Sequence, residues 1–291
     1  MKLGLLVPSI MSNSLTGFYN LQEMGLIRAF DKLGVEAIAY RLVDEKKEFE
    51  ELKIPGTKSA VEYFLPSMRI GTNGMVDLKL IDKSIDALIC FTDTQLDVPR
   101  IFKWARLNNI PFYSYVGVVE SHSDKRLKRF FMNIISNRNT KVHKASVCFV
   151  KTPYVGELLK NKGVRHIVEA PVGLDEETLK KDYASYDRDE LRSRYGYEKS
   201  DKIILFVGRL EEEKRPLDMM RIFKRLLQKD PDFRLLMVGK GSLENEVIKE
   251  AESLKDKIKL IDALPNSEMW ILYRLSDVFV NLNKGEIFGM S

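Results

Sequence analysis

The stretch IILFVGRLEEEKRP, residues 203–216, combines the end of a strand, a glycine turn and the start of a helix. Its first five residues are apolar and predict a buried strand that ends at Gly208. Arg209 and Lys214 follow, and Pro216 suits the first turn of a helix because its missing N–H would have no partner there. A strand, a turn and a helix in this order form the repeating unit of α/β proteins with parallel sheets.

The same alternation extends in both directions from this stretch. Apolar runs predict strands at 3–7, 35–42, 86–91, 111–116, 147–151, 166–170, 203–207, 233–238, 258–261 and 278–282, with amphipathic helices between most of them. Residues 175–200 are highly charged and carry no strand signal, so we interpret them as a connection and a short helix. The sequence therefore predicts an α/β protein with two Rossmann-like domains, 1–172 and 173–291.

Residues 44–80 give a weaker pattern. EKKEFEEL, residues 45–52, is charged and typical of a helix, and RIGTNGM, residues 69–75, is typical of a turn.

The composition, 44% apolar and 31% charged, is that of a globular protein, and no run approaches the roughly 20 apolar residues of a membrane span. The apolar start MKLGLLVPSI is too short for a signal peptide, so we expect a cytoplasmic protein. Cys90 and Cys148 lie in separate apolar runs and are expected to be buried thiols rather than a metal or redox pair.

Basic residues are concentrated in the first part of the chain, where residues 1–170 carry a net charge of +7 and residues 171–291 carry −2. Within residues 124–138 the apolar side chains recur at helical spacing among lysines and arginines: Leu127, Phe130, Phe131, Ile134 and Ile135. Such a helix could lie on an anionic membrane surface, or it could cover the first sheet. No nucleic-acid-binding module accompanies the charge, so a nucleic-acid partner is not expected.

Arg209 and Lys214 indicate a diphosphate site. Both follow the carboxyl end of a strand, where ligands bind in such sheets, and both precede a helix N-terminus. A guanidinium offers a fork of donors and an ammonium a point charge. The alternative is a turn with solvated charges.

Two further segments have the same placement after strands. VGKGS, residues 238–242, ends a strand in a turn where Gly239 and Gly241 permit close backbone approach. GEIFGMS, residues 285–291, places Glu286 where its carboxylate could accept hydrogen bonds from sugar hydroxyls, although a surface acid is an equal alternative.

Together these segments resemble glycosyltransferase family 4, retaining enzymes of the GT-B fold. The resemblance rests on PVGLD, VGRLEEEK, GKG and EIFG, at residues 171–175, 207–214, 239–241 and 286–289. It implies a nucleotide-sugar donor and a saccharide or lipid-linked acceptor, with no metal and no other cofactor. The D-x-D at residues 187–189 is better explained as a helix cap.

The resemblance also implies roles for individual residues. Arg209 and Lys214 would stabilise the leaving diphosphate, and Glu286 would contact the donor sugar. Further donor contacts are implied at Gly17, Gly208, Gly239, Leu264, Phe288 and Gly289. The family's second glutamate would fall at position 294, beyond Ser291, so the second domain is expected to be incomplete.

The first domain matches the family pattern less well. Many members carry a histidine at the position that Val116 occupies here, and His122 is the nearby acceptor-side candidate, although a loop histidine is more often simply solvated.

The leading hypothesis is a retaining hexosyltransferase of cell-surface polysaccharide synthesis that is cytoplasmic or peripheral at the inner face of the membrane. The alternatives are a non-catalytic sugar-nucleotide-binding module and, with less support, a sugar-nucleotide epimerase.

Overall fold

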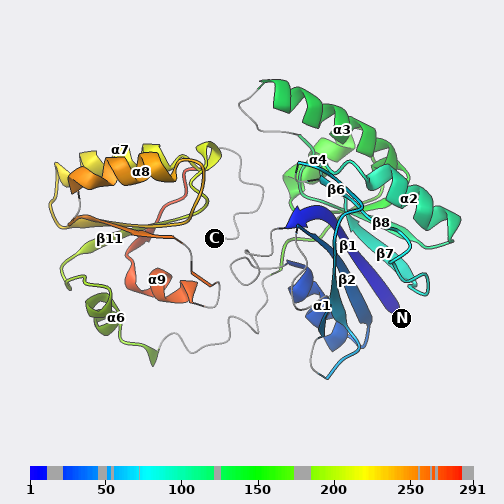
Figure 1. The fold of residues 1–291 in the computed structure, drawn as a ribbon, viewed down its shortest axis with the longest axis horizontal. Coiled ribbons are helices and arrows are strands. Elements are labelled where there is room, and N and C mark those ends of the chain that lie inside the picture. The colour runs from blue at the N-terminus through cyan, green and yellow to red at the C-terminus, as the bar shows by residue number, and fades with distance from the viewer. Residues whose placement is uncertain are drawn as a thin grey trace. The chain divides into compact units, whose positions relative to one another are not determined.

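The computed structural model describes residues 1–11, 22–44, 51–53, 56–71, 73–120, 126–173, 185–254, 256–262, 264–265 and 268–283. The chain divides into two compact units (Figure 1). The described residues up to 173 belong to the first unit and those from 185 onward to the second, and each unit is described by itself.

A large, mainly parallel sheet forms the centre of the first unit. Its strand order is β10-β9-β8-β7-β1-β2-β4-β3. These strands are β1 (Lys2–Met11), β2 (Glu36–Val43), β3 (Glu51–Lys53), β4 (Ala60–Phe64), β7 (Ala87–Phe91), β8 (Phe112–Val116), β9 (Val147–Val150) and β10 (Ile167–Glu169). All neighbouring pairs on this path are parallel except β3 with β4, so the carboxyl ends of most strands share one edge.

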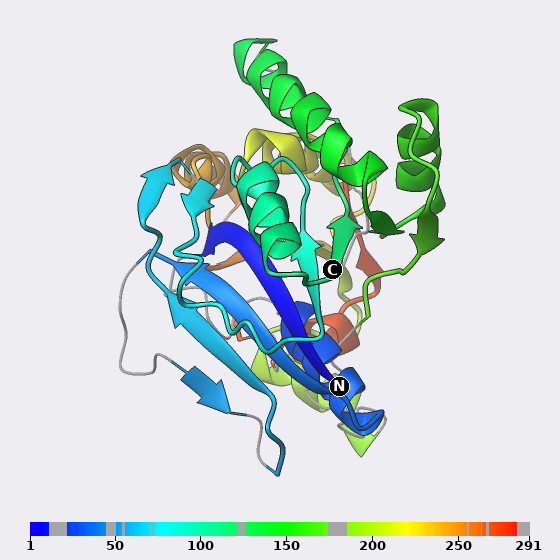
Figure 2. The same ribbon diagram turned by 90° about the vertical axis from the view of Figure 1, so that its right-hand side faces the viewer.

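Helices cover both faces of this sheet (Figure 2). On one face α1 (Gln22–Lys32) buries Ile27 against the strands. On the other face α2 (Val98–Leu107) buries Ile101 and α3 (Arg126–Lys144) buries Val142. Then α4 (Pro153–Asn161) leads into β10. Gly34 and Gly163 end α1 and α4 with positive φ, as expected of helix-terminating glycines.

The pattern at residues 44–80 did not predict the short strands found there. Residues 51 and 52, the end of the expected helix, belong to β3, which pairs antiparallel with β4, and residues 45–50 lie outside the described residues. The segment expected as a turn forms most of a hairpin of two short antiparallel strands, β5 (Met68–Ile70) and β6 (Asn73–Met75), with Gly71 in the turn between them. Tertiary pairing overrides the weak local preference of such short segments.

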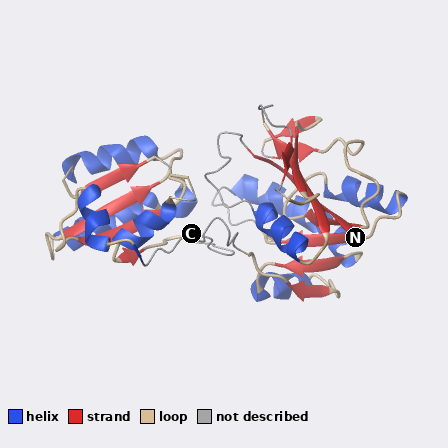
Figure 3. Ribbon diagram, turned by 90° about the horizontal axis from the view of Figure 1, so that it is seen from below, coloured by secondary structure: helices blue, strands red, loops and turns tan. Residues whose placement is uncertain are grey.

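The second unit is a three-layer α/β structure with a parallel sheet of order β13-β12-β11-β14 (Figure 3). Its strands are β11 (Lys202–Val207), β12 (Phe233–Val238), β13 (Ile258–Ile261) and β14 (Val278–Phe279). One face packs against α7 (Pro216–Leu227) and α8 (Glu244–Ala251), and the other against α6 (Arg188–Arg194) and α9 (Met269–Leu275). Parallel strands with helices on both faces confirm the predicted α/β class.

Three smaller expectations are also settled by the described residues. Asp187 caps α6, because its side chain accepts hydrogen bonds from the backbone N–H groups of Asp189 and Glu190. Both cysteines are buried free thiols, and burial raises the pKa of each. None of the described helices combines the length and the apolar character needed to cross a bilayer.

Candidate functional site

The turn that follows β11 is fixed by its neighbour, the turn that follows β12. The N–H of Gly208 donates to Val238 O at 3.0 Å, and that of Leu210 donates to Lys240 O at 2.9 Å. The Leu210 side chain is buried in the core on the α7 side. Arg209, between these anchored residues, is therefore held on the outside of the turn, where its side chain is exposed.

Two glycines make this contact between the turns possible. Gly239 has φ +143°, and a Cβ added there would lie 1.9 Å from Gly208 O. A Cβ at Gly241 would lie 2.4 Å from Leu210 O. The sequence pattern predicted that another group would come close to the backbone at these glycines. In the described residues that group is the backbone of the turn at 208–210.

A side chain reinforces the same junction. The two carboxylate oxygens of Glu211 accept from the N–H of Ser242 at 3.0 Å and from its hydroxyl at 2.7 Å. The N–H of Leu243 donates to Leu210 O at 2.9 Å. The two turns thus form one rigid edge, which we call the paired turns and define as residues 208–215 and 239–243.

Both predicted phosphate ligands lie on the paired turns. Arg209 forms an ion pair with Glu213, and both side chains are more than half exposed. Lys214 runs back past the Gly208 turn, where its Cγ lies 3.7 Å from the position of an added Cβ. An exposed ion pair contributes about 0–1 kcal/mol, so a phosphate could replace the Glu213 carboxylate at little cost.

The chain turns sharply into α7 directly after Lys214. Residues Glu212–Lys214 form a short 3₁₀ helix, and Arg215 takes the left-handed conformation with φ 57°. Pro216 is then the first residue of α7, as predicted. Arg215 Nε donates to Asp218 Oδ2 at 2.6 Å, which fixes the first turn of the helix. The two basic side chains and the amino end of α7 therefore share one loop.

The neighbouring strand ends carry further polar groups. Lys240 Nζ and Asp262 Oδ2, which follow β12 and β13, form an ion pair at 2.8 Å. Leu264, one of the implied donor contacts, packs against the core on the α9 side. Five predicted contacts, Gly17, His122, Glu286, Phe288 and Gly289, lie outside the described residues.

At the carboxyl edge of the first sheet, Val116 ends β8 and is fully buried. The loop after it is held by Asp93, whose Oδ1 accepts from the N–H groups of Gly117 at 2.6 Å and Val118 at 2.9 Å. Because position 116 is closed off in the core, it does not present a side chain to solvent, and a histidine there would be buried.

Lys151 is a feature of this edge that sequence reasoning missed. It follows β9 directly, and its Nζ lies 5.7 Å from the ring centroid of Phe91 and 5.3 Å from that of Tyr115. A Cβ at Gly117 would lie 2.6 Å from Lys151 Cδ, so the lysine stem rests on the backbone there. The available signal in the sequence was the lysine at the end of the apolar run 147–151.

Buried polar groups of α3 hold the loop that follows β7. Asn139 Nδ2 donates to the carbonyl oxygens of Thr92 and Asp93 at 3.2 Å and of Gln95 at 2.9 Å. His143 Nε2 lies 2.9 Å from Thr92 Oγ1. Burial lowers the pKa of His143 to about 4, against a smaller opposing effect of Asp93, so the imidazole is neutral near pH 7.

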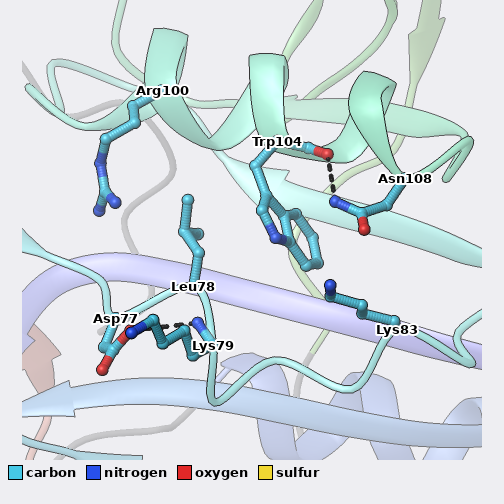
Figure 4. A pocket seen from close by; sticks show the side chains of 7 residues that line it. All are labelled: Asp77, Leu78, Lys79, Lys83, Arg100, Trp104 and Asn108. Atoms are coloured by element: carbon cyan, nitrogen blue, oxygen red, sulfur yellow. Dashed lines mark hydrogen bonds between the residues drawn. The ribbon is translucent and has the colours of Figure 1, made fainter.

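Within the described ranges no three histidine, cysteine, aspartate or glutamate side chains are grouped as a metal site would require. A cavity of about 480 Å³ in the first unit is lined by residues of the segment before β7 and of α2: Asp77, Leu78, Lys79, Lys83, Arg100, Trp104 and Asn108 (Figure 4). These residues precede β7, lie on α2 or, for Asn108, directly follow it, and none is a predicted site residue.

Comparison with known proteins places the second unit in context. Residues 187–291 match the family model for glycosyl transferases group 1. The chain is 33% identical over 101 residues to spore coat protein SA of Bacillus subtilis, covering 32% of this chain and 26% of that protein. It is 25% identical over 136 residues to alpha-monoglucosyldiacylglycerol synthase of Acholeplasma laidlawii, covering 46% and 34%. The chain thus spans about a quarter to a third of these relatives.

Solved structures extend the similarity over the whole chain. Anabaena HepE in complex with UDP superimposes with a TM-score of 0.66 at 16% identity, covering 99% of this chain and 75% of that one. An E. coli structure described as trehalose-6-phosphate bound with UDP-2-fluoro glucose has a TM-score of 0.65 at 12% sequence identity. The match covers 99% of this chain and 79% of that one. These similarities confirm the GT-B type of two-domain α/β fold.

Proposed function

We propose that the protein is a retaining glycosyltransferase of family 4 that moves a hexose-type sugar from a UDP- or GDP-sugar. The acceptor is a saccharide or a lipid-linked molecule of cell-surface polysaccharide synthesis. The observation that carries the proposal is the placement of Arg209 and Lys214 on the paired turns, inside the segment that matches glycosyl transferases group 1.

The chemistry follows from where charge develops. As the bond between sugar and diphosphate breaks, negative charge grows on the leaving diphosphate, and fixed cations stabilise that charge more than they stabilise the ground state. Arg209 supplies paired donors and Lys214 a point charge. We propose that these two cations serve in place of a metal ion. Glu286 would contact the donor sugar, with Gly17, Phe288 and Gly289 near it and Leu264 near the base.

The acceptor side is proposed at the carboxyl edge of the first sheet. His122 is the candidate from sequence, and Lys151 adds a fixed cation at the same edge. Relatives named alpha-monoglucosyldiacylglycerol synthase and D-inositol 3-phosphate glycosyltransferase support lipid or phosphorylated acceptors as classes to test. We place the protein in the cytoplasm, with access to the inner face of the membrane.

Arg209→Ala tests the donor site. A charge-assisted hydrogen bond contributes about 1.5–3 kcal/mol, so the dissociation constant for UDP or GDP, and kcat/KM where turnover is measurable, should worsen by about 10- to 100-fold. Arg221→Ala is the matched control, because this exposed arginine of α7 also forms one ion pair, with Asp218, and should leave binding unchanged.

The outcome separates the hypotheses. Equal nucleotide binding by Arg209→Ala and the parent protein would contradict the site. Nucleotide binding without donor hydrolysis or transfer would favour a binding module, and isomerised donor without acceptor would favour an epimerase. A thermal-shift screen identifies the base, since a ligand at 100 times its dissociation constant stabilises the protein by about 2.7 kcal/mol.

A further inference from the structure

The amino-terminal half of α3 exposes four large apolar side chains. Leu127 is 70% exposed, Phe130 60%, Phe131 57% and Ile134 49%. Figure 2 shows α3 extending beyond the strands that its other half covers. Single exposed apolar residues are ordinary, but four adjacent ones on one helix indicate a surface that binds something.

These four residues form one stripe. They are spaced i, i+3, i+4 and i+7, which places them on a single side of a helix with 3.6 residues per turn. The buried polar residues Ser136, Asn139 and His143 lie on the opposite side of α3, and the buried Val142 lies below Phe131 in the carboxyl-terminal half. We call the stripe, together with the exposed Arg126 and Lys141 that share its side of the helix, the α3 outer face.

The charge around this face has one sign. Residues 126–144, which form α3, contain six lysines and arginines and no aspartate or glutamate. Arg126, Arg129, Arg138, Lys141 and Lys144 are all exposed. A protein partner with both acidic and basic residues on its surface could cover the apolar stripe, but it would not explain why the surrounding charge is uniformly positive. A surface that combines fixed negative charge with an accessible apolar layer matches both features, and an anionic lipid bilayer is such a surface.

We infer that the α3 outer face docks on an anionic membrane, with the aromatic pair Phe130 and Phe131 entering the interface and the basic side chains binding lipid phosphates. The two rings are in edge-to-face contact, with centroids 5.7 Å apart, so they form one continuous apolar surface. The inference adds a defined contact surface to the proposed function, but it rests on α3 alone.

Vesicle binding tests it without donor or acceptor, so its failure is distinguishable from failure of the glycosyltransferase proposal. The chain is mixed with vesicles of phosphatidylcholine alone or with 30% phosphatidylglycerol added, on the order of physiological anionic content, and sedimented. Binding is expected only to the anionic vesicles and should weaken with added salt.

Two variants separate the contributions. Phe130→Ser with Phe131→Ser should weaken binding at least about tenfold. Arg126→Gln with Lys141→Gln should weaken it about 30-fold, from about fivefold per basic residue. The control is Ile222→Ser with Arg225→Gln, which removes one apolar and one basic side chain from the exposed side of α7. It should leave vesicle binding unchanged.

A second readout locates the contact. In Phe131→Trp, the new indole should shift its emission to the blue on anionic vesicles, relative to the parent protein with its two native tryptophans. Unchanged emission, or equal binding by all variants, would overturn the inference. So would a dimer in solution that Phe130→Ser with Phe131→Ser converts to a monomer, because the face would then belong to a second copy.

Discussion

Helices α3 and α7 have similar amphipathic sequences but use them differently. In α7, Met219, Met220 and Phe223 are buried against the second sheet, and the basic residues lie outside. In α3, Leu127, Phe130 and Phe131 of the first two turns are exposed, and the buried side is partly polar, with Asn139 and His143. Apolar periodicity therefore identifies a helix and its apolar stripe, but it does not say whether that stripe faces a core.

The largest expected difference concerns stability. Phe223→Ala should lower the free energy of unfolding of the second unit by about 3–5 kcal/mol, because Phe223 is fully buried and the change leaves a cavity. Phe130→Ala, the matched change on α3, should cost no more than about 0.5 kcal/mol. Urea unfolding of both variants measures this, and similar losses in the two would mean that Phe130 is covered.

Acid should act on α3 through His143. Its pKa is about 4 in the folded protein and 6.5 in an exposed chain, so between these values the unfolded state binds more protons. The contribution of neutral His143 to the free energy of unfolding is fully present above pH 6.5. It is lost as the pH drops toward 4, and the loss is about 3 kcal/mol at most. His143→Gln should remove this part of the pH dependence in unfolding measured from pH 7 to 4, and an unchanged slope would refute the assignment.

A smaller effect is expected at Asn139. Asn139→Ala removes the donor shared by three backbone carbonyls and should cost about 1–3 kcal/mol. Asn137→Ala is the control, because Asn137 is an exposed residue of the same helix whose amide oxygen accepts one bond from Lys162. Thermal unfolding compares the two variants. Equal losses of stability would show that the buried hydrogen bonds of Asn139 contribute no more than the exposed one of Asn137.

Most of the fold could be predicted because each strand of the pattern is a continuous apolar run followed by a helix. The β3–β4 and β5–β6 pairs were missed because strands of three to five residues are specified by their partners rather than by their own sequence. For the candidate site, sequence order placed Arg209 and Lys214 on one loop before a helix. It could not show that Glu213 pairs with Arg209 or that Lys151 lies over two rings, since both depend on side-chain directions.

The contact of Gly239 with Gly208 O has a consequence for anyone who diversifies this protein. No side chain fits at 239, whereas an alanine at 208 would meet only the Lys214 stem at ordinary distance. Mutational tolerance should therefore be asymmetric, with glycine alone accepted at 239 and small residues accepted at 208. A library that alters substrate preference should keep 239 and 241 fixed and vary positions such as 213 and 240, where the side chains are exposed.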